Sequence, residues 1–468
     1  MRIDVLPDDV LHRIFDFYVY RRTPWHGHKG EIEACQWQSL VHVCRRWRSL
    51  VFQSPRRLDL QLVCTHQTPA KDRLDIWPGL PLIVSFRGNI HTTLSGMDNV
   101  IAALGRTDRV RQVNLSGNWQ QLGKVLAVMD VSFPELTILR LTLVGSPQNI
   151  PDTFLGRSAP RLQVMSLDSF PFPEMPKLLL SATHLIELRL HRISYAEYIS
   201  PDAIVASLSM LTSLKSLKID LVSSYPRPSQ TLPTRKRSIL PALVKFHFEG
   251  DTQYLEDLVS RIDTPHLVEM HMTFFGLNEV DLNCPRLAQF VNCTPTLRER
   301  DEAHLRFRNR IATVALRYRR SKSPFGDLQI NIPCIGPGRQ LLSIDSEVCN
   351  FLLHPLSTVE DLYIDGCCRL LWENNAIETD LWLELLRPFT AVQNLHLSEQ
   401  FALGIAAALG ELVGRRIIEV LPSLQNILLR GFSQSGPFQE RIGQFLAARR
   451  LSNRPITISV MDRNGYCT

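Results

Sequence analysis

One apolar pattern recurs along the chain from Val110 onward and restricts the folds that the chain can adopt. In each copy, an apolar residue is followed by two variable residues, a second apolar residue, one variable residue and a third apolar residue. A weaker copy begins at Leu287. Successive copies start 26, 26, 23, 29, 29, 24 and 20 residues apart, and then 38, 34, 33 and 32 residues apart. The clear copies begin at Val110, Leu136, Leu162, Leu185, Leu214, Leu243, Leu267, Phe325, Val359, Val392 and Leu424.

The spacing of the copies distinguishes two α/β architectures. A crossover of strand, helix and strand needs about 30 residues or more, whereas a leucine-rich repeat uses roughly 20 to 29 residues and one short strand. The first seven intervals fit the shorter repeat, and the last four leave room for longer helices. Residues 57–468 therefore resemble an irregular leucine-rich-repeat-like solenoid with parallel strands, capped by a helix and a strand within 438–460. A compact sheet-and-helix domain is the alternative.

The residue between the second and third apolar positions of each copy predicts a surface. Neighbouring residues of a strand point to opposite faces, so these residues should face away from the apolar core. We expect them to line the inner, concave face of the solenoid. In chain order they are Asn114, Arg140, Ser166, Arg189, Lys218, His247, His271, Gln329, Tyr363, His396 and Leu428.

Part of this predicted face is basic, and carboxylates beside it temper its charge. Several cations in a concave row concentrate the electrostatic field on an anion. The row therefore favours a protein target with an acidic or phosphorylated segment. A solvated sheet face without a ligand fits the same residues equally well. The predicted target-binding residues are Arg140, Arg189, Lys218, His247, His271 and Tyr363.

The stretch from Val5 to Phe52 has helical spacing instead. Pro7 suits a first helical turn, and Asp8 and Asp9 oppose the positive end of the helix dipole. Two apolar stripes follow at spacings of three and four residues, which predicts two helices joined by a loop. A segment this short is marginal as an independent core, so we expect a partner or a neighbouring domain to cover part of it.

The order of residues in this stretch resembles the F-box, a small helical module. The resemblance rests on Leu6-Pro7, Val10-Leu11, Ile14-Phe15, Leu40, Val43-Cys44-Arg45, Trp47 and Leu50-Val51. The segment from Arg21 to Gln36 departs from it by lengthening the loop between the helices. An unrelated helical hairpin is the alternative interpretation.

In the F-box family, the module docks on the Skp-type adaptor of a cullin-based ubiquitin ligase. The resemblance implies such a module over residues 1–56, followed by a repeat body of the kind found behind F-boxes in fungal proteins. It places Leu6, Pro7, Leu11 and Phe15 in contact with the adaptor, with Trp47 as an anchor beneath them. The full set of implied adaptor-binding residues is Leu6, Pro7, Val10, Leu11, Ile14, Phe15, Leu40, Val43, Cys44, Trp47, Leu50 and Val51.

A basic segment over residues 298–322 separates the two series of copies. Leu305, Ile311, Ala315 and Tyr318 have spacings that predict one apolar face of a solvated helix. A nucleic-acid-binding patch is the alternative, but a net charge of +6 on 468 residues does not favour it.

The rest of the composition predicts a protein of the cytoplasm or nucleus. The N-terminus lacks the pattern of a signal peptide, and the longest uncharged apolar run, 401–410, is too short to span a bilayer. The ten cysteines include no Cys-x-x-Cys pair, which predicts that they are reduced thiols. His26, His28 and Cys35 lack the paired spacing of a zinc site, and Cys367-Cys368 matches no redox motif. We expect no cofactor and no metal.

Together these observations predict a receptor without catalytic residues of its own. The F-box would hold the Skp-type adaptor, and through it a cullin ligase, while the repeat body binds a protein target. We expect neither nucleic acid nor membrane as a partner. A leucine-rich-repeat scaffold without a ubiquitin-ligase role is the alternative. An enzyme would need a clustered acid, base or metal site, which the sequence does not show.

Overall fold

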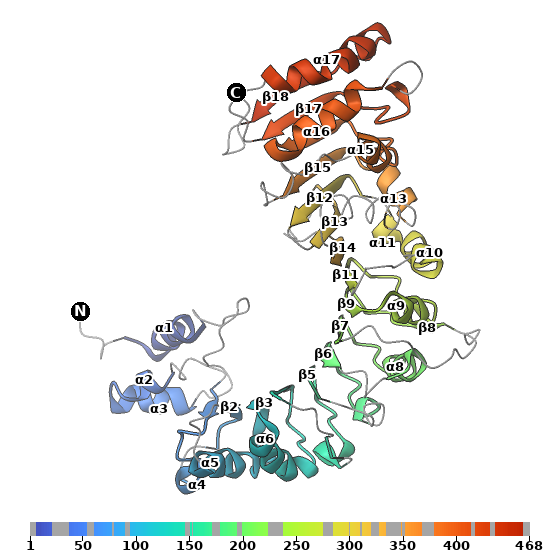
Figure 1. The fold of residues 1–468 in the computed structure, drawn as a ribbon. Helices are drawn as coiled ribbons and strands as arrows, with labels where there is room; N and C mark the ends of the chain where they lie inside the picture. Colours follow the sequence, from blue (N-terminus) through green and yellow to red (C-terminus); the bar gives the residue numbers. More distant parts are fainter. Residues whose placement is uncertain are drawn as a thin grey trace. The chain divides into compact units, whose positions relative to one another are not determined.

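The computed structural model divides into two compact units, Met1–Glu197 and Tyr198–Thr468 (Figure 1). The boundary at residue 56 that the sequence predicts stays a prediction. The structure describes residues 6–20, 37–53, 60–76, 79–88, 94–145, 150–151, 153–170, 178–193, 199–222, 237–274, 284–298, 300–308, 311–319, 327–333, 348, 352–366, 379–412, 417–430 and 436–461.

The first unit begins with three helices, α1 (Asp8–Tyr20), α2 (Trp37–Val41) and α3 (Arg45–Gln53). The ring of Phe15 packs edge-on against Trp47, with 4.9 Å between the ring centroids. Arg46 forms an ion pair with Asp8 and donates a hydrogen bond to the carbonyl oxygen of Leu6 at 2.7 Å, so α3 holds the start of α1.

Six parallel strands form the sheet of the first unit, in the order β1-β2-β3-β4-β5-β6. The strands are β1 (Leu62–Cys64), β2 (Leu82–Arg87), β3 (Val110–Gly117), β4 (Ile138–Leu143), β5 (Val164–Asp168) and β6 (Glu187–Ile193). Between them lie α4 (Ala70–Arg73), α5 (Leu94–Leu104), α6 (Trp119–Leu126) and the 3₁₀ helices η2 (Ala127–Asp130) and η3 (Phe154–Arg157).

The main sheet of the second unit has the order β7-β9-β11-β14-β13-β12-β15-β16-β17-β18. Its strands are β7 (Ser216–Leu221), β9 (Lys245–Gly250), β11 (Glu269–Phe274), β12 (Glu302–Arg308), β13 (Ile311–Arg317), β14 (Leu328–Pro333), β15 (Asp361–Gly366), β16 (Asn394–Ser398), β17 (Asn426–Arg430) and β18 (Thr457–Met461). The short strands β8 (Ser238–Ile239) and β10 (Ile262–Asp263) pair separately. The helices are α8 (Pro201–Leu208), α9 (Thr252–Val259), α10 (Pro285–Cys293), α11 (Pro295–Arg298), α13 (Leu353–Ser357), α15 (Thr379–Leu386), α16 (Glu399–Gly410) and α17 (Gly436–Leu451).

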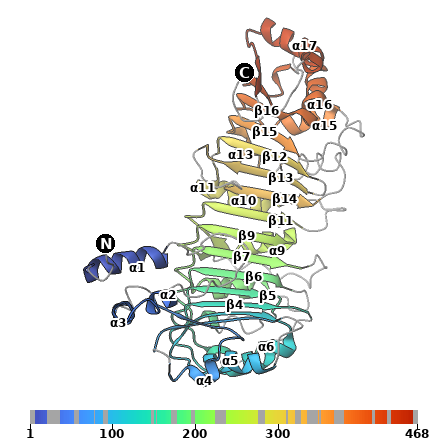
Figure 2. The same cartoon turned by 90° about the vertical axis from the view of Figure 1, so that its left-hand side faces the viewer.

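Each unit is an α/β array of the leucine-rich-repeat type, as the apolar spacing predicted. Successive strands lie side by side within a unit, and the described helices that connect them gather along one side of the sheet (Figures 1 and 2). The second and third apolar residues of each copy are buried under those helices, as Leu139 and Leu141 of β4 illustrate. The opposite side of each sheet carries no helix among the described elements that follow β1, and we call it the open face.

Two predictions about the middle of the chain are wrong. The segment predicted as a solvated basic helix contains β12 and β13, an antiparallel hairpin that continues antiparallel into β14. Ala303, Leu305 and Phe307 alternate with polar residues and are buried, which is the period of a strand half-covered on one face. The weak copy at Leu287 lies in α10. The sheet of the second unit is therefore mixed, with parallel strands on both sides of the insertion.

The predicted C-terminal cap is present as α17 and β18. Arg449, on α17, is fully buried and donates hydrogen bonds to the carbonyl oxygens of Leu421 at 2.9 Å and Leu424 at 3.3 Å. Its guanidinium therefore ties the last helix to the turn that precedes β17. Arg450, next to it, is exposed.

Replacement of Arg449 by methionine should lower the free energy of unfolding by about 3 kcal/mol, because buried carbonyl groups lose a charged donor while the apolar stem is kept. Urea unfolding followed by circular dichroism measures the change. Arg450→Met is the matched control and should change the free energy by less than about 0.5 kcal/mol. Equal losses in the two variants would contradict this role.

Candidate functional site

The N-terminal module distributes the predicted adaptor-binding residues between its core and its surface. The sequence pattern placed Leu11 and Phe15 in contact with a partner, but both side chains are fully buried within the folded chain. Leu40, Leu50 and Val51 are buried as well. Leu6, Val10, Cys44 and Trp47 are half-buried, and Pro7, Ile14 and Val43 are exposed.

Large apolar side chains remain exposed on this module. On α1, Ile14 is 41% exposed, Phe17 60% and Tyr18 44%, and Val43, in the turn between α2 and α3, is 57% exposed. Residues three and four apart share one face of a helix, so Ile14, Phe17 and Tyr18 lie together. We call these four residues the apolar patch. The sequence reasoning left Phe17 and Tyr18 out, although their spacing from Ile14 signals a common face.

On the open face of the first unit, the register sets the predicted residues side by side. Asn114 pairs with Arg140, Arg140 with Ser166, and Ser166 with Arg189 on neighbouring strands. Arg140 donates from Nη1 to Oδ1 of Asn114 at 3.3 Å. Arg189 forms an ion pair with Glu187, two residues earlier on β6. The predicted row exists here, with part of its positive charge balanced within the sheet.

In the second unit, Lys218, His247 and His271 occupy neighbouring positions on β7, β9 and β11. The imidazole rings of His247 and His271 stack with 4.4 Å between their centroids and 25° between their planes. Oε1 of Glu269 lies 3.5 Å from Nε2 of each histidine, and Oε2 lies 2.7 Å from Nζ of Lys245. Hydrogen bonds from His247 and Lys245 outweigh the effect of burial and lower the pKa of Glu269 to about 2.

Further along the open face, three rings from β12, β15 and β16 form a stack that we call the ring column, consisting of His304, Tyr363 and His396. Ring centroids are 4.3 Å apart between His304 and Tyr363, and 4.0 Å apart between Tyr363 and His396. The guanidinium carbon of Arg430 lies 5.0 Å from the centroid of Tyr363. The sequence analysis missed His304 because it lies in the segment predicted as a helix.

The histidines of the ring column are uncharged at neutral pH. Burial, reinforced by Arg317, lowers the pKa of His304 to about 3. Burial and Arg430 lower the pKa of His396 to about 4 against the opposing effect of Asp361. Nε of Arg317 donates a hydrogen bond to Nε2 of His304 at 2.7 Å. This part of the open face therefore presents flat, neutral rings beside arginines, where the sequence pattern suggested only a continuous polar row.

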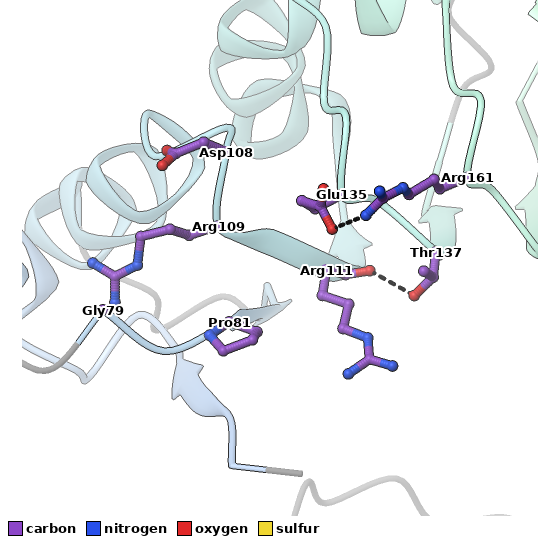
Figure 3. Close-up of a pocket in the computed structure, with 8 residues that line it drawn as sticks. All are labelled: Gly79, Pro81, Asp108, Arg109, Arg111, Glu135, Thr137 and Arg161. Atoms are coloured by element: carbon purple, nitrogen blue, oxygen red, sulfur yellow. Dashed lines mark hydrogen bonds and ion pairs between the residues drawn. The ribbon is translucent and has the colours of Figure 1, made fainter. Parts of the chain in front are cut away.

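A pocket of about 360 Å³ lies in the first unit, beside the starts of β3 and β4 (Figure 3). Arg161 forms an ion pair with Glu135, and the hydroxyl of Thr137 donates to the carbonyl oxygen of Arg111 at 3.0 Å. Arg109 donates to the carbonyl oxygen of Leu80 at 3.0 and 3.1 Å. These contacts hold neighbouring repeats together, so the polar residues that make them have a structural role in the fold.

Several sequence features lie outside the described residues, namely His26, His28, Cys35, Cys367 and Cys368. Within the described part of the chain, none of the helices has the length and apolar character needed to cross a membrane.

Comparison with known proteins finds similarity to a curated protein and to solved structures. No protein-family model matches the sequence. The chain is similar to F-box/LRR-repeat protein 21 of Mus musculus, with 23% identity over 331 residues, covering 64% of this chain and 73% of the mouse protein. The leucine-rich repeat-containing protein LegL7 from Legionella pneumophila aligns with 87% of this chain and 92% of its own at 12% identity, with a TM-score of 0.28, too low to carry an argument. By its name, the mouse relative combines an F-box with leucine-rich repeats.

The ring column should make the second unit less stable in acid. Above pH 6.5 its histidines are neutral in both the folded and the unfolded chain. As the pH falls through 6.5, these histidines take up protons in the unfolded chain. In the folded chain they stay neutral until the pH reaches about 4 for His396 and about 3 for His304. The free energy of unfolding therefore decreases as the pH falls. Each histidine contributes at most about 2 kcal/mol of this loss by pH 5.

Urea unfolding at pH 7.5 and pH 5.0 tests this expectation in the wild type and in a His304→Asn/His396→Asn variant. The variant should lose less stability between the two pH values, because it lacks the two histidines that exclude protons in the folded chain. His266→Asn, an exposed histidine, is the matched control and should behave as the wild type does. Identical pH dependence in the wild type and the double variant would overturn the assignment.

Proposed function

We propose that this chain is the substrate-recognition subunit of a ubiquitin ligase of the Skp, cullin and F-box type. The N-terminal module would bind the Skp-type adaptor, and the open face of the repeat array would bind a protein target. The apolar patch is the observation that carries this proposal. The similarity to a mouse F-box/LRR-repeat protein and the Leu-Pro and Cys-Arg-x-x-Trp order of the module support it.

Two sets of residues in the module have different roles, one in its core and one on its surface. Phe15 packs against Trp47, and Leu11 is fully buried, so these residues hold the shape of the module. Ile14, Phe17 and Val43 point outward, where contact with an adaptor would remove apolar surface from water at about 25 cal/mol per Å². Exposed apolar side chains on one face of a helix, such as Ile14, Phe17 and Tyr18, are typical of protein-binding surfaces. We therefore assign the adaptor contact to the apolar patch, which keeps Ile14 and Val43 of the implied set, adds Phe17 and Tyr18, and leaves out the buried Leu11 and Phe15.

The target would meet the open face of the array. Tyr363, two neutral histidines and Arg430 present large side chains with little conformational freedom, which are the residue types enriched at protein interfaces. Arg140 and Arg189 in the first unit, and Lys218 in the second, add positive charge for an acidic or phosphorylated segment. The array would then contribute recognition, without bond chemistry of its own.

The receptor would accelerate ubiquitin transfer by proximity. Holding a target beside the catalytic arm of a ligase replaces an encounter between separate molecules with one inside a complex, which raises the effective concentration of the target. Such a role needs two binding surfaces and no acid, base or nucleophile from this chain. A scaffold that recruits partners without an adaptor would use the same open face, and the apolar patch distinguishes the two roles.

Co-purification of the full chain with a Skp-type adaptor tests the proposal. The wild type should bind, and a Phe17→Asp/Val43→Asp variant should lose at least about 100-fold in affinity, because charge would be buried at the centre of the contact. Leu451→Asp is the matched control, since Leu451 is equally apolar, is 90% exposed and lies at the end of α17. It should bind as the wild type does.

A Leu11→Asp/Phe15→Asp variant does not serve this purpose, because it places charges in the core of the module and should unfold it. Circular dichroism must therefore show that each tested variant is folded. A folded wild type that fails to bind the adaptor, or a patch variant that still binds, would reject the ligase role and favour the scaffold.

The target hypothesis has its own test. Arg189→Glu/Lys218→Glu should remove one or more proteins that co-purify with the wild-type chain, because each substitution reverses a charge on the open face. Lys124→Glu/Lys215→Glu makes the same change of charge at exposed positions off the predicted row and should leave those proteins bound. No difference between the two variants would reject the basic row as a target site.

A further inference from the structure

We propose that His247, Glu269 and His271 form a binding site for a divalent transition metal ion, with zinc as the best fit. Their donor atoms all lie within 4.8 Å of one another on the open face of the second unit. The proposal does not depend on a ubiquitin-ligase role. The sequence analysis expected no metal site here because the three residues come from two strands and form no spaced motif.

Strand register brings the three side chains together. His247 of β9 and His271 of β11 are Cα partners across a parallel pair, which stacks their rings. Glu269 precedes His271 by two residues on β11, so its side chain points to the same face. The three donors therefore sit on backbone that both neighbouring strands and the buried row beneath hold in place. A site built on strands needs little rearrangement to bind an ion.

Two distances between the donor atoms match the coordination sphere of zinc. Ligand atoms about 2.1 Å from a zinc ion at tetrahedral angles lie about 3.4 Å from one another. Oε1 of Glu269 lies 3.5 Å from Nε2 of His247 and 3.5 Å from Nε2 of His271. Nε2 of His247 is buried, and Oε1 of Glu269 is its polar neighbour at 3.5 Å. An ion between these atoms would be coordinated by both.

The carboxylate of Glu269 is oriented for this role. Oε2 accepts from Nζ of Lys245 at 2.7 Å, while Oε1 is directed at the two imidazoles. A partner on the second oxygen is the usual way in which proteins fix a ligating carboxylate. The positive charge of Lys245 also offsets part of the negative charge of Glu269 that would attract a cation. This favours a metal ion that binds mainly through nitrogen donors.

The donor set selects the class of ion. Two imidazole nitrogens and one carboxylate oxygen suit zinc, cobalt, nickel or copper, whereas calcium and magnesium prefer oxygen donors throughout. Three protein ligands leave a fourth tetrahedral position, which water would fill on this exposed side of the sheet.

Isothermal titration calorimetry of the full chain with zinc tests the proposal. The wild type should bind one zinc ion that a His247→Gln/His271→Gln variant does not bind. Single His247→Gln and Glu269→Gln variants should each weaken zinc binding by at least about 100-fold. Replacing a residue that only hydrogen-bonds to a metal ligand already lowers metal affinity about 10- to 100-fold. His266→Gln, which replaces an exposed histidine three residues before the start of β11, is the matched control and should bind as the wild type does.

Cobalt absorption separates this site from any cysteine-containing site elsewhere in the chain. Cobalt bound to two histidines and a glutamate should give visible bands without the near-ultraviolet thiolate band, and His247→Gln should abolish them. A His26→Gln/His28→Gln variant should leave them unchanged. Bands that survive His247→Gln and Glu269→Gln, or zinc binding that is the same in the wild type and in the His247→Gln/His271→Gln variant, would overturn the proposal.

Discussion

In-register pairing of the strands is the constraint on which both units depend. Leu217, Phe246 and Met270 follow one another across β7, β9 and β11 as a buried row, and each of them is followed by a residue of the open face. A slip of one residue in any strand would turn its apolar side chains toward water, at about 1.5 to 3 kcal/mol for each side chain. The same register that builds the core therefore lines up the side chains opposite it. The stacked histidines of β9 and β11 and the ring column are consequences of this alignment.

Much of the repeat array could be predicted from the sequence, because one short apolar pattern indicates both where a strand lies and which of its residues are buried. The predicted row from Asn114 to Arg189, and again from Lys218 to His271, is the row that the register forms. The hairpin of β12 and β13 could not be predicted in this way. It interrupts the repeat, and its apolar residues happen to satisfy a helical spacing as well as an alternating one. Because of that error, His304 could not be recognised from the sequence as a residue of the open face.

The N-terminal module shows a different limit of sequence reasoning. Spacing identifies which residues of a helix share a stripe, but not which stripe faces the neighbouring helix. Phe15 lies inside because Trp47 of α3 packs against it, whereas Phe17, two residues later, faces outward. Charge has a similar limit. Carboxylates beside the basic row were expected to temper its charge, and the structure shows the contacts by which Glu187 does so for Arg189 and Glu269 for His271.

We propose that one chain carries an adaptor surface on its N-terminal module and a separate recognition surface on its repeat strands. Hydrogen–deuterium exchange of the full chain, with and without a Skp-type adaptor, distinguishes the two surfaces. The adaptor should slow exchange within residues 6–20 and 37–53 and leave exchange in the strands from β7 to β18 unchanged. Slowed exchange on those strands, or no slowing in the N-terminal module while the chain is folded, would rule out this division of surfaces.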